Sequence, residues 1–330
     1  MSGKLVLSSP PELEPAIADV IFSRRDPRIS ISELAFVVHA SPARTVEAIR
    51  QLKKLGYPLH LSRESIEHHP FIRIDLQQLG ADLATERIGR RIEWRLHLCS
   101  TQDELKKLKS EALDGTVVIA ETQYGGRGRL TRSWFSAVGG IWMSILLRPT
   151  WPESHQILSL AFAGAVARAI GDVTKLSPVI KWPNDLMVRS RKVAGLLAEA
   201  TYKDNQLDHL IFGLGVNANI QMTRLPKALR GISTSISHEL GREINRTLLA
   251  KRIIQEMDNS YQRFESGHAS ELLEEAKQIC STLGRIVRVA TAERKFVGRA
   301  LDLGGDGQLL VRLSSGVTVP FYAADGVHLR

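Results

Sequence analysis

The hydrophobic pattern near the N-terminus predicts two short helices joined by a tight turn. In both stretches, apolar residues recur at the three- and four-residue spacing of one helix face. Ser30 and Glu33 have the spacing of a capping box, and Ser41 followed by Pro42 is typical of a helix start. The apolar positions are Ile31, Leu34, Ala35 and Val38 in the first helix, and Val46, Ile49, Leu52 and Leu55 in the second. Two helices joined in this way form a helix-turn-helix.

Two short apolar stretches, 59–61 and 71–74, are predicted as the strands of a wing beside this helix pair, with His68 and His69 at its tip. The second helix carries short polar and basic side chains, which suit a helix that reads the major groove of DNA. The DNA-contact candidates are Ser41, Arg44, Thr45, Arg50 and Lys53. A basic helix face that is merely solvated explains the same residues.

The central part of the chain, about 92–270, alternates apolar strands with long amphipathic helices. The apolar runs predict buried strands over 116–120, 141–147, 193–200 and 209–216. One helix is expected to begin at Ser154, and another covers 248–264. This mixture indicates an α+β fold.

Short Val- and Leu-rich runs separated by glycine turns follow in the last fifty residues. They predict strands over 287–290, 295–300, 308–313 and 317–320, which suggest a small barrel. The chain therefore divides into three modules, 1–80, 81–275 and 276–330.

The composition is that of a soluble globular protein: of 330 residues, 43% are hydrophobic and 24% charged, which excludes wholesale disorder, collagen and coiled coil. Cys99 and Cys280 form no disulfide framework and no CxxC pair. No stretch approaches the ~20 apolar residues of a membrane span, so we expect a cytoplasmic protein with no membrane partner. The net charge of +9 indicates a polyanion or a phosphate-bearing substrate. Residues 1–90 hold 12 Lys and Arg against 11 Asp and Glu, so most of the excess lies beyond them.

The segment Glu121–Trp134, which follows a predicted strand, interleaves three glycines with three arginines. Glycine lets a backbone turn sharply, and arginine offers a planar charged fork for carboxylate or phosphate. The pattern favours a cationic loop that closes over an anionic ligand. It lacks the spacing of a Walker A motif; an arginine-glycine nucleic-acid segment and a plain surface loop are the alternatives. The residues concerned are Gly125, Gly126, Arg127, Gly128, Arg129 and Arg132.

A second cluster places two lysines around a turn. Lys181 precedes Pro183-Asn184-Asp185, and Lys192 opens the next predicted strand. If the flanking strands pair, both ammonium groups approach one end of the sheet, where they can neutralise a phosphate or carboxylate. A turn with solvated lysines is the alternative.

A third segment, Gly213-Leu-Gly-Val-Asn-Ala218, formally fits a dinucleotide-binding pattern, but no apolar-periodic helix follows it, so we reject that interpretation. Asn217 has amide groups suited to an adenine edge. Residues 219–237 are predicted as a loop that orders over a ligand. No nucleophile with a paired base is evident, so the chemistry is expected to depend on positioning and charge neutralisation.

Taken together, these motifs resemble those of the bacterial bifunctional biotin–protein ligases that also repress biotin synthesis genes. The most specific matches are Gly126-Arg127-Gly128-Arg129 with Trp134, and Lys181-Trp-Pro-Asn-Asp185 followed by Arg191-Lys-Val-Ala-Gly195. The resemblance implies an N-terminal winged helix-turn-helix, a central mixed sheet with helices of the class II synthetase-like type, and a C-terminal SH3-like barrel. It also implies a reaction in which biotin and ATP form biotinyl-adenylate, and biotin then passes to a lysine of the biotin carboxyl carrier protein.

The resemblance further implies roles for individual residues. The biotin site would comprise Ser100, Thr101, Gln102, Gln123, Arg127, Gly128, Arg129, Lys192 and Gly195, with Gln102 where the family usually has Asn. The ATP site would comprise Arg129, Arg132, Trp134, Lys181, Asn184, Asp185 and Asn217, with Asp185 also on the Mg²⁺ side. Lys192, Arg127 and Arg129 would be catalytic.

Operator DNA and a second copy of the chain would be partners for repression, which requires two half-sites read together. The wing segment 63–70 has no glycine and two glutamates, unlike the usual wing tip. Two other functions stay open: a repressor that senses biotin without ligase activity, and a lipoate-type ligase.

Overall fold

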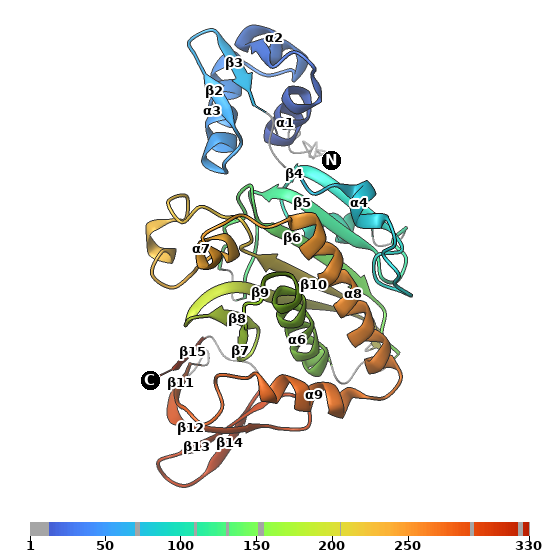
Figure 1. Cartoon of the computed structure of the whole chain (residues 1–330), viewed down its shortest axis with the longest axis vertical. Helices are drawn as coiled ribbons and strands as arrows, with labels where there is room; N and C mark the ends of the chain where they lie inside the picture. The colour runs from blue at the N-terminus through green and yellow to red at the C-terminus, as the bar shows by residue number, and fades with distance from the viewer. Residues whose placement is uncertain are drawn as a thin grey trace, which may run out of the picture.

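The chain folds into three consecutive modules that follow one another along the long axis of the molecule (Figure 1). This architecture comes from a computed structural model. It describes residues 13–69, 73–108, 111–129, 132–150, 155–204, 206–290, 294–322 and 326–329.

The first module packs three helices on a small antiparallel sheet of order β1-β3-β2. Its elements are α1 (Leu13–Ser23), β1 (Arg28–Ser30), α2 (Ile31–Val37), α3 (Pro42–Lys54), β2 (Leu59–Leu61) and β3 (Ser65–His68). Both predicted helices are confirmed, together with their caps. The Ser30 side chain accepts from the Glu33 amide at 3.0 Å, and the Ser41 side chain accepts from the Arg44 amide at 3.4 Å.

The second wing strand differs from the prediction of 71–74. The chain turns directly after β2, because the Ser62 hydroxyl accepts from the Ser65 amide at 3.0 Å. The strand therefore begins at Ser65 and pairs with β2 earlier than expected. Residues 71 and 72 lie outside the described residues, and 73 and 74 are not in a strand. His68 belongs to β3 and packs against the Phe22 ring, with centroids 5.4 Å apart, so it does not lie at the wing tip.

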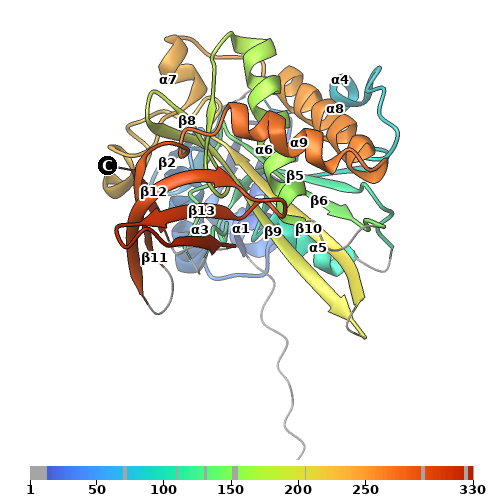
Figure 2. The ribbon, with the colours of Figure 1, turned by 90° about the horizontal axis from the view of Figure 1, so that it is seen from below.

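The central module contains a seven-stranded mixed sheet of order β4-β5-β6-β10-β9-β8-β7. Only β4 and β5 run parallel; the other described pairs are antiparallel. The strands are β4 (Ile92–Leu98), β5 (Val117–Gln123), β6 (Ile141–Leu147), β7 (Val179–Lys181), β8 (Asp185–Val188), β9 (Arg191–Lys203) and β10 (Gln206–Val216). The four buried strands predicted from the apolar runs are confirmed. Figure 2 shows the far ends of β9 and β10 projecting from the body of the molecule.

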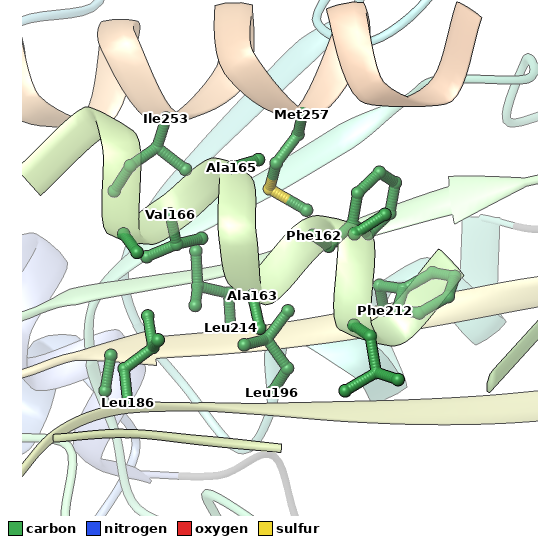
Figure 3. Packing of buried hydrophobic residues seen from close by; sticks show 14 of the residues in the cluster. Phe162, Ala163, Ala165, Val166, Leu186, Leu196, Phe212, Leu214, Ile253 and Met257 are labelled. Atoms are coloured by element: carbon green, nitrogen blue, oxygen red, sulfur yellow. The ribbon is translucent and has the colours of Figure 1, made fainter. Parts of the chain in front are cut away.

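Helices cover one face of this sheet. They are α4 (Leu76–Gly80), α6 (His155–Thr174), α7 (Ile236–Leu240), α8 (Arg246–Glu265) and α9 (Ala269–Gln278), while α5 (Thr101–Leu108) packs on the other face. Figure 3 shows α6 between the sheet and α8, with Phe162 against Phe212 at 4.9 Å between ring centroids. The stretch Gln156–Thr174 has the length and apolarity to cross a membrane, but 72% of it is buried in this core. Ser154, the predicted start of α6, lies outside the described residues.

Residues 74–80, which precede the predicted division at residue 80, pack against the central strands. Ile74 and Leu79 are buried in the same core cluster as the central strands. The amide of Asp75 donates to the Thr247 hydroxyl at 3.0 Å, which ties α4 to α8. Residues 74–80 therefore pack with the central module.

The last module is a five-stranded antiparallel sheet of order β14-β13-β12-β11-β15. Its strands are β11 (Ile286–Ala290), β12 (Lys295–Leu303), β13 (Leu309–Leu313), β14 (Thr318–Phe321) and β15 (Gly326–Leu329). The four predicted strands are confirmed, and β15 was not predicted. Trp182 anchors this module to the central one, because its indole N–H donates to the Gly307 carbonyl at 3.0 Å.

A buried polar chain joins the first module to the central sheet. The Tyr57 hydroxyl, just beyond α3, donates to the Leu96 carbonyl at 2.6 Å and lies 2.8 Å from Thr122 Oγ1. Burial raises the pKa of Tyr57, so its hydroxyl stays protonated. His97 Nδ1 also lies 2.6 Å from Thr122 Oγ1. Burial lowers the pKa of His97 to about 4, so its ring is neutral at pH 7.

We predict that Tyr57→Phe weakens this junction by about 1–3 kcal/mol, because it leaves buried polar partners without the hydroxyl. The measurement is the urea midpoint of the first unfolding transition. Tyr202→Phe is the matched control, since Tyr202 is 57% exposed. Equal midpoints for the two variants would contradict the role of Tyr57.

We also predict that His97 makes the fold sensitive to acid. Between pH 6.5 and about 4 the unfolded His97 binds a proton and the folded one does not, so stability falls as the pH is lowered through this range. The contribution reaches about 3 kcal/mol. His97→Asn keeps a polar group near Thr122 without titrating. The free energy of unfolding of this variant should fall less between pH 7 and pH 4 than that of the wild type. An equal fall in both proteins would show that His97 does not cause the acid sensitivity.

Candidate active site

A single cavity of about 480 Å³ brings together the ligand-site residues predicted from the sequence. They come from sequence segments that are far apart and meet over β9 and β10. The predicted residues that line it are Ser100, Thr101, Gln102, Gln123, Arg127, Gly128, Arg129, Arg132, Trp134, Lys181, Asn184, Asp185, Lys192, Gly195 and Asn217.

Bare glycine backbone forms the floor of this cavity. Gly195 on β9 lies directly opposite Gly215 on β10, and Gly213 is two residues along the same strand. A Cβ on Gly215 would lie 2.5 Å from Trp134 Nε1, and one on Gly195 would lie 3.0 Å from Trp134 Cζ3. A Cβ at Gly215 would force the indole to shift and one at Gly195 would be tightly packed, so the two glycines let the Trp134 indole lie close to the sheet.

The sequence interpretation missed Gly213 and Gly215 as floor residues. In the sequence they belong to the rejected dinucleotide motif. Their spacing of two residues on one predicted strand indicates that both face the same side of the sheet. Successive residues of a strand face opposite sides. Phe212 and Leu214 face α6 (Figure 3), so the glycines face the cavity.

Gln102, whose family counterpart is usually Asn, is only 4% exposed and crosses the floor. Its Nε2 donates to the Leu197 carbonyl at 3.4 Å, and a Cβ on Gly213 would lie 2.9 Å from its side-chain carbonyl. The longer side chain is therefore accommodated by Gly213.

One end of the cavity is a network of neutral hydrogen bonds. Gln123 Oε1 accepts from the Thr101 amide at 2.8 Å and from the Thr101 hydroxyl at 3.1 Å. Gln123 Nε2 donates to Ser136 Oγ at 2.9 Å, and Thr101 Oγ1 lies 2.6 Å from Ser144 Oγ. These bonds fix the end of β5 against the first turn of α5, and they create a rigid, uncharged polar wall.

The arginine-glycine segment forms a small hairpin over the cavity. The Gly128 amide donates to the Arg132 carbonyl at 2.7 Å, and the Trp134 amide donates to the Gly126 carbonyl at 2.8 Å. A Cβ on Gly125 would lie 2.5 Å from the Cys99 sulfur, so the hairpin passes too close to its neighbours for a side chain there. Residues 130 and 131 lie outside the described residues.

The opposite end of the cavity is cationic. Lys192 Nζ lies 2.5 Å from Asp185 Oδ1 and 4.6 Å from the centroid of the Trp134 ring. Lys181 is the register partner of Asp185 across β7 and β8. The two lysines therefore approach the same end of the sheet, as the sequence predicted.

At the cationic end of the cavity, Asn184 and Asp185 are both held by contacts with β9. Asn184 holds the turn to β9, since its side-chain amide donates to the Leu196 carbonyl and its own carbonyl accepts from the Leu196 amide at 3.0 Å. Asp185 pairs with Lys192. In the described parts of the chain, no group of three or more His, Cys, Asp or Glu side chains is arranged to hold a metal ion.

The segment 219–237 closes the cavity from the side and is anchored at its end. It contains a short 3-10 helix, η2 (Lys227–Leu229), and leads into α7. The Thr234 amide donates to the Lys192 carbonyl at 2.8 Å. Asn217 Nδ2 donates to the Thr234 carbonyl at 2.9 Å. The amide expected to face a nucleotide thus also fastens this segment beside Lys192.

The DNA-contact candidates lie apart from the cavity, on α3. Ser41, Arg44, Arg50 and Lys53 are exposed. Thr45 is not, contrary to the sequence interpretation: it is fully buried and its hydroxyl donates to the Ser41 carbonyl at 3.0 Å. The helix turn places Thr45 inward, so it is not available to DNA.

The cavity offers an uncharged polar end, an aromatic face and a cationic end. Among the described residues that line it there is no histidine or cysteine. Its charged and uncharged ends suit it to bind and polarise an anionic ligand.

Two segments of the chain match known protein families. Residues 89–217 match the biotin/lipoate A/B protein ligase family, and residues 282–328 match the biotin protein ligase C-terminal domain. The bifunctional ligase/repressor BirA of Bacillus subtilis is 30% identical over 284 residues, which cover 84% of this chain and 86% of the relative. The Escherichia coli bifunctional ligase/repressor BirA is 28% identical over 225 residues, covering 68% of each chain.

Among solved structures, a biotin protein ligase from Aquifex aeolicus in complex with biotin and ATP is similar, with a TM-score of 0.65 and 27% identity. The match covers 73% of this chain and 99% of that one. The shared fold, the matched segments and the convergence of the motif residues on one cavity lead to one conclusion: the chain belongs to the biotin/lipoate A/B protein ligase family.

Proposed function

We propose that the protein is an ATP-dependent biotin–protein ligase that also acts as a biotin-responsive repressor. The observation that carries the ligase function is the single cavity in which the motif residues meet, with Lys192 between the aromatic face and the cationic end. A cytoplasmic location fits the need for ATP and for a carrier protein.

Each end of the cavity suits one part of the substrates. The polar wall of Ser100, Thr101 and Gln123, with Gln102 across the floor, offers the neutral donors and acceptors that the ureido ring of biotin needs. The Trp134 indole offers a stacking face for adenine. Arg129, Arg132 and Lys181 line the cavity and supply positive charge for the phosphates.

With biotin and ATP bound side by side in the cavity, the reaction proceeds in two steps. A carboxylate oxygen of biotin attacks the α-phosphorus of ATP, the bond to the bridging oxygen breaks, and diphosphate leaves. Lys192 and Arg129 neutralise the charge that builds on the α-phosphoryl oxygens. In the second step the lysine amine of the biotin carboxyl carrier protein attacks the acyl carbon, and AMP leaves.

We propose that Mg²⁺ enters with ATP as part of the substrate, since Mg²⁺ in nucleotide sites is bound chiefly by phosphates, water and one or two carboxylates. Asp185 is the one acidic side chain among the described lining residues. Asp185 would be the residue of the cavity lining to hold Mg²⁺ bound to the phosphates of ATP.

We propose that the first module is a winged helix-turn-helix that binds operator DNA as part of a dimer, and that the last module is an SH3-like barrel. Two helices, a turn and an antiparallel wing support the first assignment. The exposed side of α3 carries Arg44, Arg50 and Lys53, although Arg50 also lies 3.4 Å from Glu47. A sensor without ligase activity and a lipoate-type ligase are separated from this proposal by the assay below.

We predict that the protein transfers labelled biotin to the lysine of a biotin carrier domain when ATP and magnesium are present. Lys192→Ala should slow adenylate formation by about 10²–10³-fold, because it removes a positioned charge at the α-phosphate. Lys203→Ala, an exposed position on β9, is the control. Biotin binding without transfer would favour the sensor, and transfer of lipoate in place of biotin would favour the lipoate-type ligase. A full-rate Lys192→Ala enzyme would remove Lys192 from the mechanism.

For DNA, we expect a dimer to bind a two-fold symmetric duplex selected from a random-sequence library, with strong salt dependence. Arg44→Ala and Lys53→Ala should each lower the slope of log affinity against log salt by about 1 if the residue contacts phosphate. Lys295→Ala, exposed in the last module, should leave the slope unchanged. Binding without any sequence preference would contradict the repressor function.

A further inference from the structure

The Arg127 side chain, assigned above as catalytic, is held by two carboxylates at the rim of the cavity. Its guanidinium donates to Asp103 Oδ2 at 2.6 Å and to Glu199 Oε1 at 3.5 Å. Asp103 lies on α5 and Glu199 on β9, so one arginine of the hairpin contacts two separate parts of the scaffold.

The positions of these acids follow from the residues that build the cavity. Asp103 comes directly after Gln102 in the first turn of α5. Glu199 follows Gly195 at a spacing of four on β9, so it faces the same side of the sheet as the glycine floor. Its register partner is Ile211, which belongs to the cluster that α5 covers. The acids therefore lie just beyond the biotin end of the floor.

A lysine completes this cluster. Lys106 Nζ lies 2.7 Å from Glu199 Oε2 and 3.9 Å from Asp103 Oδ1. It orients Glu199 toward Arg127 and balances the second negative charge. The Arg127 hydrogen bond holds the pKa of Asp103 below its usual value, so the carboxylate is charged at neutral pH.

The contacts of Arg127 with the two carboxylates differ from fully exposed ion pairs, because each of the three side chains is partly buried. The exposed fractions are 32% for Arg127, 32% for Asp103 and 28% for Glu199. Partial burial and charge-assisted hydrogen bonding strengthen such pairs relative to fully exposed ones.

We propose that Asp103 and Glu199 form a latch that, through Arg127, holds the described parts of the hairpin, residues 125–129 and 132–134, closed over the biotin end of the cavity. Arg127 is then a positioning residue rather than a catalytic one. The latch rests on the proposed function, since the ligand it retains is biotinyl-adenylate. Opening the hairpin exposes the activated acyl group to water and lets the adenylate leave before the carrier lysine arrives.

The first test detects opening without any ligand. Trypsin cleaves after arginine, and Arg127, Arg129 and Arg132 all lie in the hairpin. Asp103→Asn should raise the rate of cleavage there about tenfold in the full-length protein, as followed by mass spectrometry of the fragments. Glu199→Gln should raise it less, because its contact with Arg127 is longer. Asp103→Glu should restore most of the protection, since it keeps the charge.

The second test measures retention of the adenylate. The enzyme is incubated with labelled biotin and ATP, diphosphate release confirms adenylate formation, and unlabelled adenylate is added as a chase. Asp103→Asn should raise the dissociation rate about tenfold. Glu104→Gln is the matched control on the same helix, because Glu104 pairs with Arg95 at 3.1 Å and not with the hairpin.

The outcomes separate the two proposals. Lack of diphosphate release by the wild type would defeat the ligase function, while the trypsin rates still decide whether the latch exists. Hairpin cleavage of Asp103→Asn at the wild-type rate would overturn the latch. Equal effects of Glu104→Gln and Asp103→Asn would also overturn it, because they would show a general loosening of α5.

Discussion

The architecture of the site depends on one constraint, the bare backbone where Gly195 faces Gly215 across β9 and β10. The indole of Trp134 rests on this patch; a Cβ at Gly215 would collide with it, and one at Gly195 would be in tight contact with it. With the indole in place, the Lys192 ammonium lies over its ring and reaches Asp185. The missing side chains thus set how close to the sheet the Trp134 ring and the Lys192 ammonium lie.

Strand β5 connects this cavity to the junction with the first module. Neighbouring residues of a strand point to opposite faces. Thr122 contacts Tyr57 and His97 at the junction, whereas Gln123 contacts Thr101 in the polar wall. The end of β5 therefore contacts both the wall of the cavity and the junction with the first module. A displacement of the end of β5 would disturb the contacts at the junction and the contacts in the polar wall together.

Most strands and helices could be predicted because each has a local cause, whereas the biotin-site roles of Ser100, Thr101 and Gln123 follow only from the resemblance to biotin–protein ligases. The caps of α2 and α3 need only Ser30 and Ser41, and β5, β6, β9 and β10 are read from apolar runs. The errors concern features set by distant partners. The position of β3 depends in part on its pairing with β1, where Ser65 lies opposite Ser30, and the burial of Thr45 depends on how α3 packs. The latch contacts of Arg127 depend on Glu199. This residue lies 72 positions away in the sequence and comes close to Arg127 only in the fold.

The net positive charge of the sequence is not all available to a ligand in the folded protein. Several arginines beyond residue 90 are consumed by the scaffold: Arg168 pairs with Glu256 and Arg246 with Glu121, at 2.8 Å in each case. They offer nothing to a ligand. The described lining of the cavity holds three arginines and two lysines, of which Arg127 already contacts Asp103 and Glu199, and Lys192 contacts Asp185. A low-dielectric cleft with one sign of charge concentrates its field on a small volume, which favours a compact polyanion such as a triphosphate over an extended one.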